Sequence, residues 1–180
     1  MQLAVAAEDR QATEGDAGIV VRAPRDRDGP RVWQLVADTA SLDGNSVYCN
    51  LLQCSHFAGT CAIAERDGEI MGWLSGYIPP SDPDTYFVWQ VCTAAGARGR
   101  GLGKRLIAEV LARDACKGVT RIQSTITDDN VPSWGLFRSI AAAQDAAMSR
   151  KPHFTRDDHF DGRHDTEFLV TIGPIRREAG

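Results

Sequence analysis

A glycine-rich segment that carries several cations is the part of the sequence whose residue types point most directly to chemistry. It runs Ala94-Ala95-Gly96-Ala97-Arg98-Gly99-Arg100-Gly101-Leu102-Gly103-Lys104, between an apolar run and a stretch of helical periodicity. Glycines let the backbone approach a ligand closely, and the N–H groups at a helix start attract anions. Four cations gather here although the formal net charge of the chain is -4: Arg98, Arg100, Lys104 and Arg105. The segment therefore predicts a site for a phosphate-bearing ligand.

Two other kinds of phosphate loop fit this segment poorly. A Walker A loop needs Ser or Thr after its Gly-Lys pair to bind magnesium, and Arg105 follows Gly103-Lys104 here. A Rossmann loop needs a third glycine and normally follows the first strand of its fold, whereas this loop lies beyond the middle of the chain.

Hydrophobic periodicity and turn residues predict the elements that position the loop. Strands are expected at 19–21, 60–65, 69–78, 86–92, 119–126 and 166–172, and Asp67-Gly68 predicts a tight turn between the second and third. Helices are expected at 26–37, from Ser46 as the N-cap to Cys54, at 102–115 and at 132–143. No helix or strand is assigned to the polar stretch rich in His and Asp before the last strand.

The motif R-x-x-G-x-G, made by Arg98, Gly101 and Gly103 after an apolar strand, resembles the acetyl-CoA pyrophosphate loop of the GNAT N-acetyltransferase superfamily. The order of the expected elements is also similar to that superfamily, over about residues 18 to 172. The resemblance implies an α/β (α+β) fold with a mixed, mostly antiparallel central sheet flanked by helices. Its central strands would splay apart to bind acetyl-CoA as cosubstrate, with no metal.

The resemblance also implies a set of cofactor contacts. Backbone groups of Val91, Cys92 and Thr93 would bond the pantetheine arm, and the pyrophosphate would lie against Arg98, Gly99, Arg100, Gly101, Leu102, Gly103 and Lys104. Asn130 matches a polar position that touches the pantetheine or thiol region in relatives. Its place at the start of a helix suits an N-cap equally well, so both interpretations stand.

A further resemblance concerns the amine that would be acetylated. The run Leu42-Asp43-Gly44-Asn45-Ser46-Val47-Tyr48, with Phe87-Val88-Trp89-Gln90-Val91 and Thr127-Asp128-Asp129-Asn130, resembles the GNAT branch that acetylates L-2,4-diaminobutyrate in ectoine synthesis. For such a substrate we expect Asp43 to hold an ammonium group, Tyr48 to lie beside it and Trp89 to wall the pocket. A turn role for Asp43 and a core role for Trp89 remain alternatives.

Acetyl transfer requires a neutral amine, but an alkyl ammonium has a pKa of about 10.4, so the site needs a proton acceptor. Phe137 stands where many relatives carry a tyrosine that protonates the leaving thiolate, and the strand 85–93 contains no carboxylate. His164 and Glu167, beside the last strand, are the predicted catalytic residues. Solvated loop charges are the alternative interpretation for both.

Composition limits the class of protein. The 180 residues, 43% of them hydrophobic, suit one N-acetyltransferase domain at 18–173, after a disordered leader at 1–17 and before a tail at 174–180. The net charge of -4 argues against nucleic acid, and the absence of a long apolar run or signal sequence predicts a cytoplasmic protein without a membrane partner.

The five cysteines predict buried thiols, because they are few, widely spaced and odd in number. His153, His159 and His164 alternate with aspartates, but their spacing matches no standard metal site, so no metal is expected. The resemblance implies a homodimer. Two alternatives to diaminobutyrate acetylation remain open, namely a GNAT enzyme for another small amine and a non-catalytic sensor that binds acyl-CoA.

Overall fold

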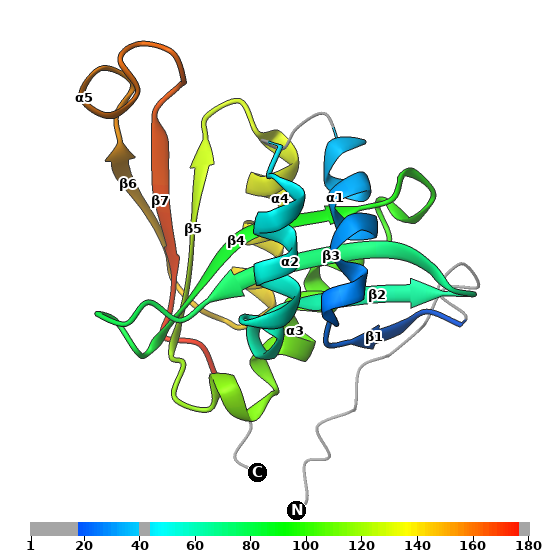
Figure 1. The fold of residues 1–180 in the computed structure, drawn as a ribbon. Helices are drawn as coiled ribbons and strands as arrows, with labels where there is room; N and C mark the ends of the chain where they lie inside the picture. Colours follow the sequence, from blue (N-terminus) through cyan, green and yellow to red (C-terminus); the bar gives the residue numbers. More distant parts are fainter. Residues whose placement is uncertain (1–17, 40–43, 177–180) are drawn as a thin grey trace, which may run out of the picture.

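Seven strands form one sheet in the order β1-β2-β3-β4-β5-β7-β6, in a computed structural model that describes residues 18–39 and 44–176 (Figure 1). Neighbouring strands are antiparallel except β4 and β5, which are parallel. The elements are β1 Val20–Arg22, α1 Gly29–Ala37, α2 Val47–Ser55, β2 Ala62–Arg66, β3 Glu69–Tyr77, β4 Thr85–Thr93, α3 Leu102–Leu111, β5 Arg121–Thr127, α4 Val131–Ala143, β6 Met148–Phe154, α5 Arg156–Phe160 and β7 Glu167–Ile172. The expected mixed, mostly antiparallel sheet is confirmed.

Helices cover both faces of the sheet, because side chains alternate along the central strands. Trp73 packs with Cys92 and with Val32 of α1 in one buried cluster, whereas the adjacent Leu74 packs with Leu106 of α3 in a larger one. Figure 1 shows α1 and α2 over one face of the sheet, with α3 and α4 behind it. Within the described residues, no helix is long and apolar enough to cross a membrane.

Local signals in the sequence locate several element boundaries. Asp67 and Gly68 adopt φ values of 51° and 81°, as the tight β2–β3 turn requires. The Ser46 side chain accepts the N–H of Cys49 at 3.1 Å and caps α2, as predicted. Four of the five cysteines are buried and Cys49 is half-buried.

The stretch before the last strand contains two elements that the sequence patterns do not predict. Residues 148–154 form the edge strand β6, and 156–160 form the short helix α5. Almost all of β6 is exposed and it contains Pro152, so the strand lacks the alternating apolar pattern that sequence reading requires. Its pairing with β7 supplies the order that its own residues do not signal.

Strands β4 and β5 separate partway along their length, and this divergence creates the space for a ligand. Their parallel pairing is limited to three residues of each strand, Thr85–Phe87 of β4 and Arg121–Gln123 of β5. Ser124 then donates its hydroxyl to the carbonyl of Val88 at 2.9 Å. Beyond this bond the two strands fan apart, as Figure 1 shows.

Gly76 lies where β3 passes over a buried ring, and we expect Gly76→Ala to destabilise the fold by about 3 kcal/mol. A Cβ atom there would lie 2.3 Å from Tyr86 Oη and 2.7 Å from the carbonyl oxygen of Phe87. Tyr86 is fully buried and donates to the carbonyl of Thr60 at 2.8 Å, so it has little freedom to move. Chemical denaturation measures the effect. Gly118→Ala, at an exposed turn where a Cβ atom would meet nothing within 4 Å, separates overpacking from simple loss of a glycine.

Candidate active site

A cavity of about 680 Å³ lies where β4 and β5 diverge, between the β4–α3 loop and the start of α4. It is lined by Asp38, Thr39, Val91, Cys92, Thr93, Ala97, Arg98, Gly99, Gly101, Leu102, Gly103, Lys104, Asn130, Pro132, Ser133 and Leu136. Every residue that the sequence predicted for cofactor binding lines it except Arg100, which lies exposed in the same loop. Segments far apart in the chain thus meet at one cavity.

The loop between β4 and α3 has the geometry of an anion site. Gly99 and Gly101 adopt φ values of 73° and 74°, a conformation that L side chains rarely take. Helix α3 begins at Leu102, and the first N–H groups of a helix have no partner within it. Arg98 and Lys104 line the cavity beside these N–H groups, so charge and helix dipole both favour a phosphate there.

Arg105, one of the four cations in the sequence motif, has a structural contact instead. Its guanidinium donates to the carbonyl of Ile19 at 2.8 Å and ties α3 to the segment before β1. The positive charge that faces the cavity therefore comes from Arg98 and Lys104 among its lining residues.

Asn130 is placed for both roles that the sequence left open, a helix N-cap and a residue of the cavity wall. Its side-chain oxygen accepts the N–H of Ser133 at 3.2 Å and caps α4. The same residue lines the cavity, opposite the loop that leads into α3. The same residue therefore caps α4 and lines the cavity.

Cys92, the cysteine that lines the cavity, does not carry an activated thiol. Cys92 is buried, and this burial raises the pKa of its thiol to about 11. A thiol with such a pKa stays protonated at neutral pH and is a weak nucleophile. Phe137 is only 1% exposed and packs in the main core. Neither residue therefore supplies a titrating group to the cavity at neutral pH.

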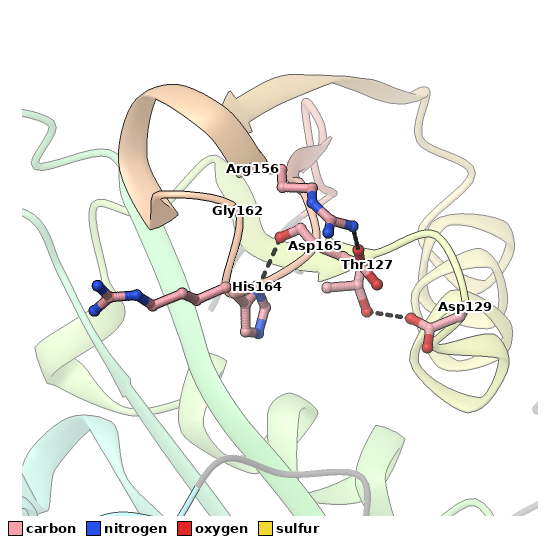
Figure 2. Close-up of a pocket in the computed structure, with 7 residues that line it drawn as sticks. Thr127, Asp129, Arg156, Gly162, His164 and Asp165 are labelled. Atoms are coloured by element: carbon pink, nitrogen blue, oxygen red, sulfur yellow. Dashed lines mark hydrogen bonds and ion pairs between the residues drawn. The ribbon is translucent and has the colours of Figure 1, made fainter.

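A smaller cavity, of about 290 Å³, lies near the end of β5 and contains His164 (Figure 2). Its lining comprises Thr127, Asp129, Arg156, Gly162, Arg163, His164 and Asp165. Thr127 donates to Asp129 at 2.6 Å, and Arg156 pairs with Asp165 at 3.3 Å. Thr127 and Asp129 line this cavity and Asn130 lines the larger one, so the short turn from Thr127 to Asn130 borders both cavities.

The two predicted catalytic residues lie together beside this smaller cavity. His164 Nε2 is 4.0 Å from Glu167 Oε1, and the Glu167 side chain is 18% exposed. The His164 ring is held by a 2.8 Å contact between Nδ1 and the carbonyl of Asp165 and by the ring of Phe160 at 4.7 Å. Glu167 begins β7 and pairs in register with Thr127 of β5. An imidazole and a carboxylate so placed can accept a proton.

The predicted amine contacts lie at the start of α2 and on β4. Tyr48, in the first turn of α2, is 69% exposed, and Trp89 on β4 is 46% exposed, so Trp89 is not a core tryptophan. The Trp89 ring meets that of Tyr77 edge-on at 6.3 Å. Asp43 lies outside the described residues. Trp73 and Trp134, by contrast, belong to the core.

Two histidines of the polar stretch rich in His and Asp make packing contacts. The rings of His153 and His159 lie 4.2 Å and 5.5 Å from that of Phe154. Across residues 18–39 and 44–176, no group of three or more His, Cys, Asp or Glu side chains is placed to hold a metal ion.

Asp38 and Thr39 line the larger cavity, although no pattern in the sequence indicates a functional role for them. Asp38 is the C-cap of α1, and Thr39 donates its hydroxyl to the carbonyl of Leu35 at 2.8 Å. The available signal was a polar pair at the end of an apolar helix, which is also typical of an ordinary helix terminus.

Comparison with known proteins agrees with this geometry. The profile of the Acetyltransferase (GNAT) family matches residues 30–141. An L-2,4-diaminobutyric acid acetyltransferase from Methylotuvimicrobium alcaliphilum is 41% identical over 158 residues, covering 88% of this chain and 92% of the relative. One from Halomonas elongata is 41% identical over 161 residues, covering 89% and 83%.

A solved structure is similar over nearly the whole chain. It is diaminobutyrate acetyltransferase EctA from Paenibacillus lautus, in complex with its substrate L-2,4-diaminobutyric acid and coenzyme A. It superimposes with a TM-score of 0.84 at 38% identity and covers 90% of this chain and 98% of its own. The family profile and these relatives show that the chain belongs to the GNAT acetyltransferase family.

Proposed function

We propose that this enzyme transfers an acetyl group from acetyl-CoA to the terminal amine of L-2,4-diaminobutyrate. The observation that carries the proposal is the similarity, at about 40% identity over most of both chains, to acetyltransferases named for this substrate. The similar structure that holds diaminobutyric acid and coenzyme A together supports it. A GNAT fold alone would leave the amine undefined, because one fold serves many acceptors.

The larger cavity is the proposed cofactor site. Its two cations and the N–H groups that open α3 would hold the pyrophosphate, with Gly99, Gly101, Leu102 and Gly103 close to it and Arg100 at its rim. Val91, Cys92 and Thr93 lie on the part of β4 that pairs with β3 but not with β5, so the backbone groups on the β5 side of this segment are available to the pantetheine arm. Asn130 would contact the arm near the thiol.

The proposed reaction is a direct attack of the amine nitrogen on the thioester carbonyl. The carbon–nitrogen bond forms, the carbon–sulfur bond breaks, and coenzyme A leaves as a thiolate that takes its proton from water. Glu167, with His164 beside it, accepts the proton that the amine loses. A backbone N–H near Val91 would stabilise the oxyanion. The protonated state of Cys92 favours this route over a covalent acetyl-enzyme.

The acceptor amino acid carries two ammonium groups and one carboxylate, so its pocket needs negative charge and apolar walls. We assign Asp43 to an ammonium group, Tyr48 to the pocket beside it and Trp89 to a wall. The exposed rings of Tyr48 and Trp89 suit this role, because they offer apolar surface that is free of core packing.

We further propose that the enzyme works in the cytoplasm as a homodimer without a metal. Acetyl-CoA is available in that compartment, and the exposed edge strand β6 offers free backbone groups for contact with a second copy. Light scattering coupled to size-exclusion chromatography should give twice the chain mass of 19.6 kDa. A monomer at assay concentration would contradict the dimer.

Nuclear magnetic resonance of the reaction product tests which amine reacts. After turnover of L-2,4-diaminobutyrate and acetyl-CoA, the acetamide proton should couple to the terminal methylene group. Coupling to the α-proton instead would show acetylation of the other amine and would contradict the proposed orientation of the substrate.

A further inference from the structure

One hydrogen bond joins the start of helix α2 to strand β4 on the acceptor side of the proposed site. Asn45 Nδ2 donates to Gln90 Oε1 at 2.7 Å, and Gln90 is only 7% exposed. Asn45 directly precedes Ser46, the N-cap of α2. Because the bonded residue and the cap are adjacent, the bond fixes the first turn of the helix to the strand.

An irregularity in β4 places Trp89 on the same side of the sheet as Gln90. Ser75 of β3 lies opposite Gln90, and the register shift at the next pair leaves Trp89 as an extra residue, a β-bulge. In a regular strand Trp89 and Gln90 would point to opposite faces. The Trp89 ring instead meets Tyr77, which shares a face with Ser75, so Trp89 and Gln90 project to the same side.

We propose that Asn45 and Gln90 are positioning residues for the acceptor amine. Their bond holds Tyr48, in the first turn of α2, in a fixed place relative to Trp89 on the bulge. The inference rests on the proposed function, in which Tyr48 and Trp89 form part of the amine pocket. Gln90 also adjoins Val91, which lines the cofactor cavity, so the same bond places the amine pocket relative to the thioester.

The chemistry of the pair suits a positioning role. A side-chain amide does not titrate near neutral pH, so the bond keeps its geometry while nearby groups exchange protons. Removing either partner leaves the other side chain with a lost hydrogen bond near the strand and loosens the helix start. Small misplacement of a bound reactant lowers the rate of attack strongly, so the effect should appear in the kinetics of the amine.

Steady-state kinetics of a double-mutant cycle test the proposal. Asn45→Ala and Gln90→Leu should each raise the KM for the amine about tenfold, and leave the Kd of coenzyme A unchanged. The double variant should be no worse than Gln90→Leu alone, because both lack the same bond. Gln90→Glu retains an acceptor oxygen and should keep KM within about threefold of the wild type.

A matched control separates positioning from loss of stability. Gln123→Leu removes a glutamine side chain of β5 that donates to Thr171 at 3.1 Å, and it should not change the KM for the amine. Additive effects of Asn45→Ala and Gln90→Leu, an equal rise in KM in Gln123→Leu, or weaker coenzyme A binding would each overturn the proposal. If Gln90→Leu does not fold, Asn45→Ala and Gln90→Glu still test the positioning role. A wild-type KM for the amine in Asn45→Ala would overturn the proposal.

The failure of diaminobutyrate as a substrate would be a separate result. The wild-type enzyme is assayed first with several amines, and the cycle is then run with the amine that it acetylates fastest. Poor turnover of diaminobutyrate, with fast turnover of another amine, would contradict the proposed function. Independent effects of the two variants on the KM for the preferred amine would contradict the positioning role.

Discussion

Glu167→Gln should lower kcat about a hundredfold to ten-thousandfold, the range that general base catalysis contributes. The substitution keeps the size of the side chain and its place at the start of β7 but removes the carboxylate that lies 4.0 Å from His164 Nε2. His164→Ala should lower kcat in the same direction. The Kd of coenzyme A should stay at its wild-type value, because neither residue lines the larger cavity.

Glu109→Gln is the matched control for this prediction. Glu109 lies exposed on α3, so its substitution changes the net charge equally but leaves the site intact. Wild-type rates in both Glu167→Gln and His164→Ala would remove these residues from the reaction, and the proton would need another acceptor.

Arg98→Ala and Lys104→Ala should each weaken coenzyme A binding about tenfold to a hundredfold, since each removes a charged hydrogen-bond donor from the cavity. Titration calorimetry measures the change. At low ionic strength the loss should be largest, because salt screens the charges that both side chains supply.

Lys117→Ala provides the comparison for these two variants. Lys117 is an exposed cation that does not line the cavity, and its loss changes the net charge by the same amount. Equal affinity in Arg98→Ala, Lys104→Ala and Lys117→Ala would mean that the loop does not bind the phosphates of the cofactor.

The fold could be predicted where local signals agree with tertiary packing. The Ser46 cap, the Asp67-Gly68 turn and the apolar run of β4 each dictate a boundary through their own residues. Strand β6 could not be predicted in this way, because it is exposed at the sheet edge and owes its conformation to pairing with β7. The bulge at Trp89 arises from the register between two strands, which no local pattern encodes.

The candidate site was predictable to a similar degree. The phosphate loop is contiguous in the sequence, so its glycines and cations identify it directly. The role of Arg105 was misjudged because its guanidinium extends to Ile19, a contact across the fold. Asp38, Thr39 and the bond from Asn45 to Gln90 were missed because their significance depends on elements that meet only after folding.

Release of free thiol from acetyl-CoA, measured with a panel of amines, tests the central claim most directly. The panel comprises L-2,4-diaminobutyrate, ornithine, lysine, 1,3-diaminopropane and spermidine. We expect the kcat/KM for L-2,4-diaminobutyrate to exceed that for every other amine by at least about tenfold. Faster turnover of another amine, or coenzyme A binding with no turnover of any amine, would contradict the assignment of this enzyme as a diaminobutyrate acetyltransferase.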